Sequence, residues 1–279
     1  MANRGLSGGR IARRCAVRSR RCRLLGGVGA LFALALAIAG LAGAGVVQEG
    51  NLRITLTSQV QPYKLPRIGT APIAILVSGH VAPVKGEVPD QLEGLDVKVN
   101  RHALLQSRGL PACRLAQIQP ATTARALATC GSALIGSGQF WAHIVLPDQG
   151  AYPTQGRLLV FNGRRHGHPI VFAHIFTAHP FASSFVISFS IRQIDSGFYG
   201  TELSASLPEA LGSWGYVDRI KLTLKRKYRY RGRQLSYFNA GCPALKGASR
   251  APFHLAYATF SFANHDISAE VDKSCGVSE

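Results

Sequence analysis

The stretch DRIKLTLKRKYRYRGRQLSYFNAGC, residues 218–242, indicates how this chain folds. From Arg219 to Leu224 apolar residues alternate with Arg, Lys or Thr, and the alternation continues through two tyrosines. A period of two is typical of a β-strand with one apolar and one polar face. Gly232 interrupts the pattern, and residues 235–238 predict a returning strand. We therefore expect a long β-hairpin with cations along one face, whose apolar face packs on a core.

The cations of this hairpin form a local patch on a protein with a net charge of +18. Eight of the 32 Lys and Arg residues lie in residues 1–23, and eight more lie in residues 219–233. Without these two runs the chain is close to neutral, because the remaining 16 cations face 14 acids. A local patch points to contact with a polyanion or a membrane surface, and a solvated strand face is the alternative. The candidate polyanion-binding residues are Lys225, Lys227, Arg229, Arg231 and Arg233.

The rest of the chain after residue 48 reads as a series of strands. Residues 52–60, 95–99 and 185–194 alternate apolar and polar side chains, and about ten such segments stand against one helix that follows Pro120. This pattern predicts an all-β, antiparallel, sandwich-like body with one short α-helix. A weak boundary near residue 140 would divide the body into two packed sub-sandwiches.

The N-terminal part predicts a membrane or export segment. Residues 1–23 hold eight arginines and no acid, which is typical of a disordered cytoplasmic tail. Residues 24–47 carry no charge and are long enough to span a bilayer as a helix, with the N-terminus inside. A signal peptide cleaved near Ala44 is the alternative, since an A-x-A site ends there. Both readings place residues 48–279 outside the cytoplasm.

Four cysteines follow the apolar segment, and we expect them to form two disulfides outside the cytoplasm. Three connectivities are open, and proximity in the sequence favours Cys113–Cys130 and Cys242–Cys275. On the chain-entropy account each bridge stabilises the fold by about 3–4 kcal/mol.

Four histidines gather at His166, His168, His174 and His179. A His-x-His turn can bind zinc or copper, so His166, His168 and His174 are candidate metal ligands. However, no carboxylate lies within the cluster and two arginines precede it, which favours a structural or solvated role.

Motifs of catalysis are missing from the sequence. There is no GxSxG elbow, no HExxH and no P-loop, and no pair of acids stands out. We therefore expect a non-enzymatic protein without a cofactor. The basic strand with its tyrosines is similar to a single-strand nucleic-acid groove, but the predicted compartment argues against that partner.

Several segments resemble a recurring, uncharacterised type of exported or membrane-anchored bacterial protein with a β-rich body. They are GLPACRLAQ at 109–117, SYFNAGCPALKG at 236–247, LAYATFSF at 255–262, and the polar segment that ends in Cys275. The resemblance supports a Cys242–Cys275 pair, implies no activity and carries over no functional residue.

Together these features predict a cell-envelope protein held in its own membrane through residues 24–47 or secreted after cleavage. Its basic hairpin is expected to contact anionic lipid headgroups or cell-wall polymers. The alternative is an extracytoplasmic hydrolase or metal-binding protein that uses the cluster His166–His179.

Overall fold

The computed structural model describes residues 44–85, 89–145, 150–207 and 215–278. Residues 42–279 form one compact unit, and its described part is mostly β-strand. Among the helices of these ranges, none is long and apolar enough to cross a membrane.

The body contains eighteen strands and three short helical segments within the described ranges. The strands are β1 (Ala44–Glu49), β2 (Leu52–Gln61), β3 (Lys64–Pro66), β4 (Ala71–Pro72), β5 (Ala74–Pro83), β6 (Leu92–Asn100), β7 (Ala103–Leu105), β8 (Leu134–Ile144), β9 (Tyr152–Arg165), β10 (His168–Thr177), β11 (Ser183–Ser196), β12 (Tyr199–Ser206), β13 (Gly215–Leu224), β14 (Lys227–Tyr230), β15 (Arg233–Ser236), β16 (Phe238–Ala240), β17 (Arg250–Phe262) and β18 (Asp266–Ser278). The helical segments are α2 (Leu115–Ile118), α3 (Thr123–Cys130) and the 3-10 turn η1 (Gly131–Ala133).

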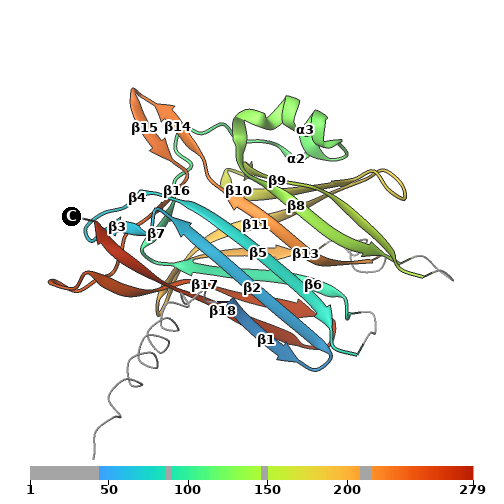
Figure 1. Cartoon of the computed structure of the whole chain (residues 1–279). Coiled ribbons are helices and arrows are strands. Elements are labelled where there is room, and N and C mark those ends of the chain that lie inside the picture. Colours follow the sequence, from blue (N-terminus) through green and yellow to red (C-terminus); the bar gives the residue numbers. More distant parts are fainter. Residues whose placement is uncertain (1–43, 86–88, 146–149, 208–214, 279) are drawn as a thin grey trace, which may run out of the picture. The chain divides into compact units, whose positions relative to one another are not determined.

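Thirteen of these strands form a single curled sheet in the order β1-β2-β5-β13-β8-β9-β10-β11-β12-β6-β17-β18-β3 (Figure 1). All neighbours are antiparallel except β18 and β3. Two small sheets, β14-β15 and β4-β16-β7, stand beside it. The predicted all-β class is confirmed, and the large strands belong to one continuous sheet where we expected separate packed sheets.

The sheet curls until its first strand approaches its twelfth. A Cβ built on Gly45 of β1 would lie 2.6 Å from the carbonyl oxygen of Glu270 on β18, which shows how closely the two backbones meet. One sheet can therefore enclose its own core, because an apolar face that curls back is covered by itself.

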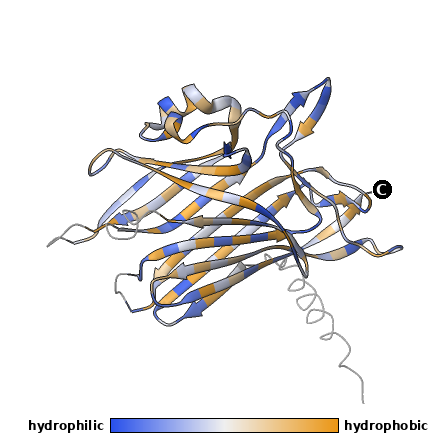
Figure 2. Cartoon of the chain, turned by 180° about the vertical axis from the view of Figure 1, so that it is seen from behind, coloured by the Kyte–Doolittle hydropathy of each residue, from blue (hydrophilic) through white to orange (hydrophobic). Residues whose placement is uncertain are grey.

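The core follows the alternation seen in the sequence. On β2, Leu52, Ile54 and Leu56 are buried while Arg53 and Thr57 are exposed. Figure 2 shows the same alternation of apolar and polar segments along the other long strands. At about 1.5–3 kcal/mol for each large apolar side chain, this burial is the main stabilising contribution to the fold.

A smaller core lies beneath α2 and α3. Ile118, Ala126 and Cys130 pack there against Phe161 of β9 and Phe172 of β10. This confirms the predicted helix, which begins after the N-cap Thr122, whose hydroxyl accepts a 3.2 Å hydrogen bond from the Arg125 amide. The four-residue α2 was not expected from the sequence.

Both favoured disulfides are present, Cys113–Cys130 and Cys242–Cys275, with Cα–Cα distances of 5.5 and 5.8 Å. The first ties α3 to the chain before α2. The second ties the end of β18 to the segment after β16.

The stretch 218–242 differs from the predicted long hairpin. Its first part belongs to β13, which lies inside the main sheet between β5 and β8. The ladder stops at Leu224, where the Lys225 amide donates to the Ile135 carbonyl oxygen at 3.0 Å and the chain leaves the sheet. Only residues 227–236 form a separate hairpin. The alternating pattern therefore predicted strands correctly, but these strands belong to two sheets.

The predicted membrane segment lies largely outside the described residues. Residues 24–43 of this segment, and the tail 1–23, lie outside the described residues. Its last residues, Ala44 to Val47, are in β1 and pair with β2. Residue 140, where we expected a weak boundary, lies within β8.

Candidate functional site

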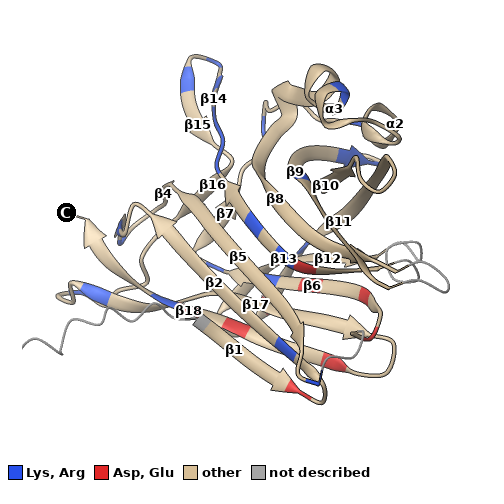
Figure 3. Ribbon diagram, turned by 45° about the vertical axis from the view of Figure 1, so that its right-hand side comes forward, with Lys and Arg blue, Asp and Glu red and all other residues tan. Residues whose placement is uncertain are grey.

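The basic hairpin, β14 and β15 with the preceding Lys225, stands apart from the main sheet (Figures 1 and 3). Its strands pair from Lys227–Ser236 to Tyr230–Arg233, and the two residues between have positive φ angles, 50° and 76°. Such a two-residue turn favours glycine at its second position, which Gly232 supplies. The turn therefore holds the two strands in a fixed register.

Tyr228 fastens this hairpin to the body. Its ring is buried, and its hydroxyl donates to the carbonyl oxygens of Gln106 and Arg108, each at 3.0 Å. Burial raises the pKa of Tyr228, so the hydroxyl stays a donor at neutral pH. At the next inward-facing position, a Cβ built on Gly109 would lie 2.1 Å from Tyr230 Cδ2. The loop 106–110 and the hairpin thus fit closely together.

All five predicted polyanion-binding residues are exposed. The guanidinium carbon of Arg231 lies 5.4 Å from the centre of the Tyr230 ring. None of the ion pairs found in the described part of the chain involves these five side chains. Figure 3 shows Lys and Arg on this hairpin and the acids on other strands. The five charges are therefore free to meet an external anion.

Two further cations have different roles that the sequence pattern could not distinguish. Arg108, exposed on the loop that holds Tyr228, extends the basic surface. Arg226 is partly buried and donates to the Ser132 carbonyl oxygen at 2.8 Å, so it serves the fold. The alternation alone gives no signal for either role, since both depend on loops distant in the sequence.

A second exposed feature lies on two neighbouring loops, residues 67–70 and 243–249, which we call the paired loops. They are joined by hydrogen bonds from Cys242 N to Pro66 O at 2.9 Å and from Arg67 Nη2 to Ala248 O at 2.8 Å. Their tips carry Ile68 and Leu245, which are 91% and 81% exposed. These are the most exposed large apolar side chains in the described ranges, and they lie on two neighbouring, hydrogen-bonded loops.

Four exposed cations flank these apolar tips. They are Lys64, Arg67, Lys246 and Arg250. Since β16 pairs with β4, which follows the first of the paired loops, the basic hairpin and the paired loops are connected through one small sheet. One of the segments that resemble exported bacterial proteins, residues 236–247, includes Leu245. Nothing in the sequence, however, distinguished Leu245 or Ile68 from core residues.

The predicted histidine cluster is not brought together. His166 and His168 are exposed at the turn between β9 and β10, and His179 is exposed after β10. His174 is fully buried, and its Nε2 lies 3.0 Å from the Ala121 carbonyl oxygen. Burial lowers the pKa of His174 despite this hydrogen bond. Within this cluster His174 has a structural environment and the other three face solvent.

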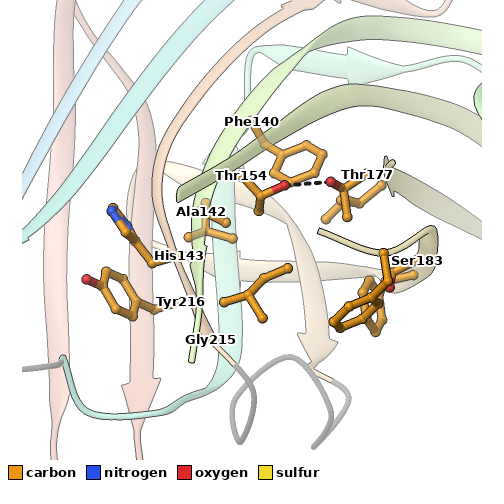
Figure 4. A pocket seen from close by; sticks show the side chains of 13 residues that line it. Phe140, Ala142, His143, Thr154, Thr177, Ser183, Gly215 and Tyr216 are labelled. Atoms are coloured by element: carbon orange, nitrogen blue, oxygen red, sulfur yellow. Dashed lines mark hydrogen bonds between the residues drawn. The ribbon is translucent and has the colours of Figure 1, made fainter. Parts of the chain in front are cut away.

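One cavity of about 180 Å³ lies between β8, β9, β10, β11 and β13 (Figure 4). It is lined mainly by apolar side chains such as Phe140, Ile175 and Phe185. Its hydroxyls from Thr154 and Thr177 lie 2.6 Å apart, so they are hydrogen-bonded to each other. The cavity therefore presents few polar groups that could orient a substrate.

The rings of His143 and Tyr216, which also line this cavity, stack with 5.0 Å between their centroids. Figure 4 shows the two side chains near each other. His143 Nδ1 lies 3.7 Å from Asp218 Oδ2, where a register shift makes Asp218 the extra residue of a β-bulge. Burial, followed by the charge of Asp218, raises the pKa of Tyr216.

The described residues contain one group of metal-ligand type, His254, Glu270 and Asp272. The sequence analysis missed it, because His254 is separated from both acids by more than fifteen residues. The available signal was the Glu-x-Asp spacing, which places both carboxylates on one face of a strand.

No protein-family model, curated protein or solved structure matches this chain. The resemblance to exported β-rich bacterial proteins therefore stays a prediction from the sequence.

Proposed function

We propose that this protein is a non-enzymatic component of the cell envelope that docks on anionic lipid headgroups through the basic hairpin. The observation that carries the proposal is the set of five exposed cations on one rigidly held hairpin, with no acidic partner among the described residues. Each Lys or Arg near an anionic membrane surface contributes about 1 kcal/mol, so five together suffice for reversible binding.

The paired loops favour a lipid surface over a cell-wall polymer. Ile68 and Leu245 expose apolar surface to water, and a hydrated polymer would not bury it. The interfacial region of a bilayer, in contrast, takes up apolar side chains beside cations. Burying such a side chain contributes about 1.5–3 kcal/mol. A cell-wall polymer, which offers phosphate or carboxylate charges alone, is the competing ligand that the test must separate.

An extracytoplasmic location is part of the same proposal. Residues 24–43 would serve as a membrane anchor or as an export signal that is removed, and β1 begins at Ala44. The two disulfides support this placement, because structural disulfides form and persist in oxidising compartments.

The direct test is co-sedimentation of residues 42–279 with vesicles of phosphatidylglycerol mixed into phosphatidylcholine, and with phosphatidylcholine alone. We expect binding to the anionic vesicles only, weakened by salt. A parallel arm uses purified, lipid-free wall polymer that carries phosphate. Binding to the polymer and not to the vesicles would assign the hairpin to the cell wall, and binding to neither would refute the proposal.

A further inference from the structure

We infer that His254, Glu270 and Asp272 form a binding site for a divalent transition-metal ion, with Zn²⁺ as the best-suited example. The inference does not depend on the proposed lipid docking, because none of these residues belongs to the basic hairpin or the paired loops.

The sheet register brings the three ligands together. His254 on β17 lies directly opposite Asp272 on β18. Glu270 is two residues before Asp272, so its side chain leaves the same face of the strand. His254 Nδ1 is 2.8 Å from Asp272 Oδ1 and 3.2 Å from Glu270 Oε1, and the ligand atoms of all three lie within 4.8 Å of one another.

These separations suit a first-row metal ion. Nitrogen and oxygen ligands bind Zn²⁺ at about 2.0–2.2 Å, and two ligands of a tetrahedral site are then about 3.3 Å apart. The donor set is mixed, with one imidazole and two carboxylates, whereas Ca²⁺ and Mg²⁺ prefer oxygen ligands alone. Three protein ligands leave a fourth position for water.

Neighbouring side chains hold the ligands in place. The Phe198 ring stacks on the His254 ring with 4.0 Å between centroids, and Asn100 Nδ2 donates to the His254 carbonyl oxygen at 2.8 Å. The Tyr199 hydroxyl donates to Glu270 Oε1 at 2.5 Å. Partners that orient the ligands in this way are a regular feature of metal sites, and their loss weakens metal affinity about 10–100-fold.

Charge and access also favour a cation. The site holds two carboxylates, Glu270 and Asp272, and a divalent ion would balance their charge. The His254 side chain is 26% exposed and Asp272 is 59% exposed, so an ion can reach the site from solvent.

The chain offers a matched control in a second surface pair, His265 and Asp90. His265 Nδ1 lies 3.6 Å from Asp90 Oδ2, and its ring stacks on Phe262 as His254 does on Phe198. This pair has only one carboxylate, so the metal hypothesis predicts no specific binding there.

The test is calorimetric titration of Zn²⁺ into untagged, chelator-treated residues 42–279, followed by Co²⁺ titration with visible absorption. We expect one ion per chain with micromolar affinity, and a Co²⁺ spectrum of low coordination number. His254→Gln and Asp272→Asn should each weaken binding at least about tenfold, while His265→Gln leaves it unchanged.

Two results would overturn the inference. The first is that the wild-type protein does not bind Zn²⁺ even at a concentration about a hundred times the expected dissociation constant. The second is that binding persists unchanged in both His254→Gln and Asp272→Asn. Asp272→Asn keeps the size of the side chain and its exposed position, so it tests the site even if His254→Gln disturbs the fold. Circular dichroism of each variant identifies such a disturbance.

Discussion

The ring of Tyr230 lies so close to Gly109 that a Cβ built on this glycine would come 2.1 Å from Tyr230 Cδ2. This contact, together with the Tyr228 hydrogen bonds, holds the basic hairpin against the loop 106–110. The orientation of the cationic surface thus depends on one residue without a side chain.

Gly109→Ala should therefore displace the hairpin. Gly167→Ala is the matched control, because Gly167 has a similar φ of 83° against 77° but nothing within 4 Å of its Cβ position. The control should lose about 1–2 kcal/mol for the left-handed backbone alone. Gly109→Ala should lose about 1–3 kcal/mol more through overpacking. Urea unfolding measures both, and equal losses would show that the contact with Tyr230 contributes nothing.

Replacing Ile68 and Leu245 by Ser should reduce the part of vesicle binding that survives high salt. Salt screens the cations but leaves apolar insertion intact, so the two contributions separate on a salt titration. The double variant should keep wild-type binding to lipid-free wall polymer. Leu104→Ser together with Val46→Ser, at two other exposed apolar positions, is the control. Loss of binding in the control and not in the paired loops would contradict the assignment.

Each disulfide should stabilise the body to a similar degree. The closed loops span sequence separations of 17 and 33 residues, and on the chain-entropy account Cys113→Ser/Cys130→Ser should lose about 3 kcal/mol and Cys242→Ser/Cys275→Ser about 4 kcal/mol. Urea unfolding of the two double variants checks this. Free energies of unfolding equal to that of the wild type would show that the bridges do not constrain the unfolded chain.

His174 should make the protein less stable in mild acid. Burial holds its pKa below 6.5 in the folded state, whereas the unfolded chain takes up the proton near pH 6.5. The stability linked to His174 is thus fully present above pH 6.5 and is lost as the pH falls below it. The free energy of unfolding should fall between pH 7.5 and 5.5, and His174→Gln should flatten that dependence. An equally steep fall in His174→Gln would assign the effect to other groups.

Much of the fold could be predicted from local patterns. The alternation in β2, the helix after Pro120 and both cysteine pairs were correct, because each depends on residues close in the sequence. The end of β13 at Leu224 was not predictable, since the apolar period continues through Tyr228. The chain leaves the sheet there through contacts with Ile135 and Gln106, which belong to distant segments.

Of the candidate sites, only the positively charged residues of the basic hairpin could be predicted from the sequence. The five hairpin cations could be listed because a run of like charges is visible in the sequence itself. The group around His254 could not, because it needs the register of β17 on β18. The histidines that cluster in the sequence have different environments along β10. His168 is exposed at the start of the strand, whereas His174 is buried in the core.

The central claim is that the cations of the basic hairpin, and not the overall positive charge, bind the protein to anionic lipid. Two variants of equal net charge test it most directly. One changes Lys227, Arg229 and Arg231 to Gln, and the other changes the exposed Arg53, Lys85 and Arg157 to Gln.

Co-sedimentation with phosphatidylglycerol-containing vesicles is measured for both variants over a range of salt concentrations. We predict that the hairpin variant loses about 3 kcal/mol of binding free energy and much of the salt dependence, while the other variant binds almost as the wild type. Equal losses in the two variants would contradict the account, because net charge alone would then explain the binding.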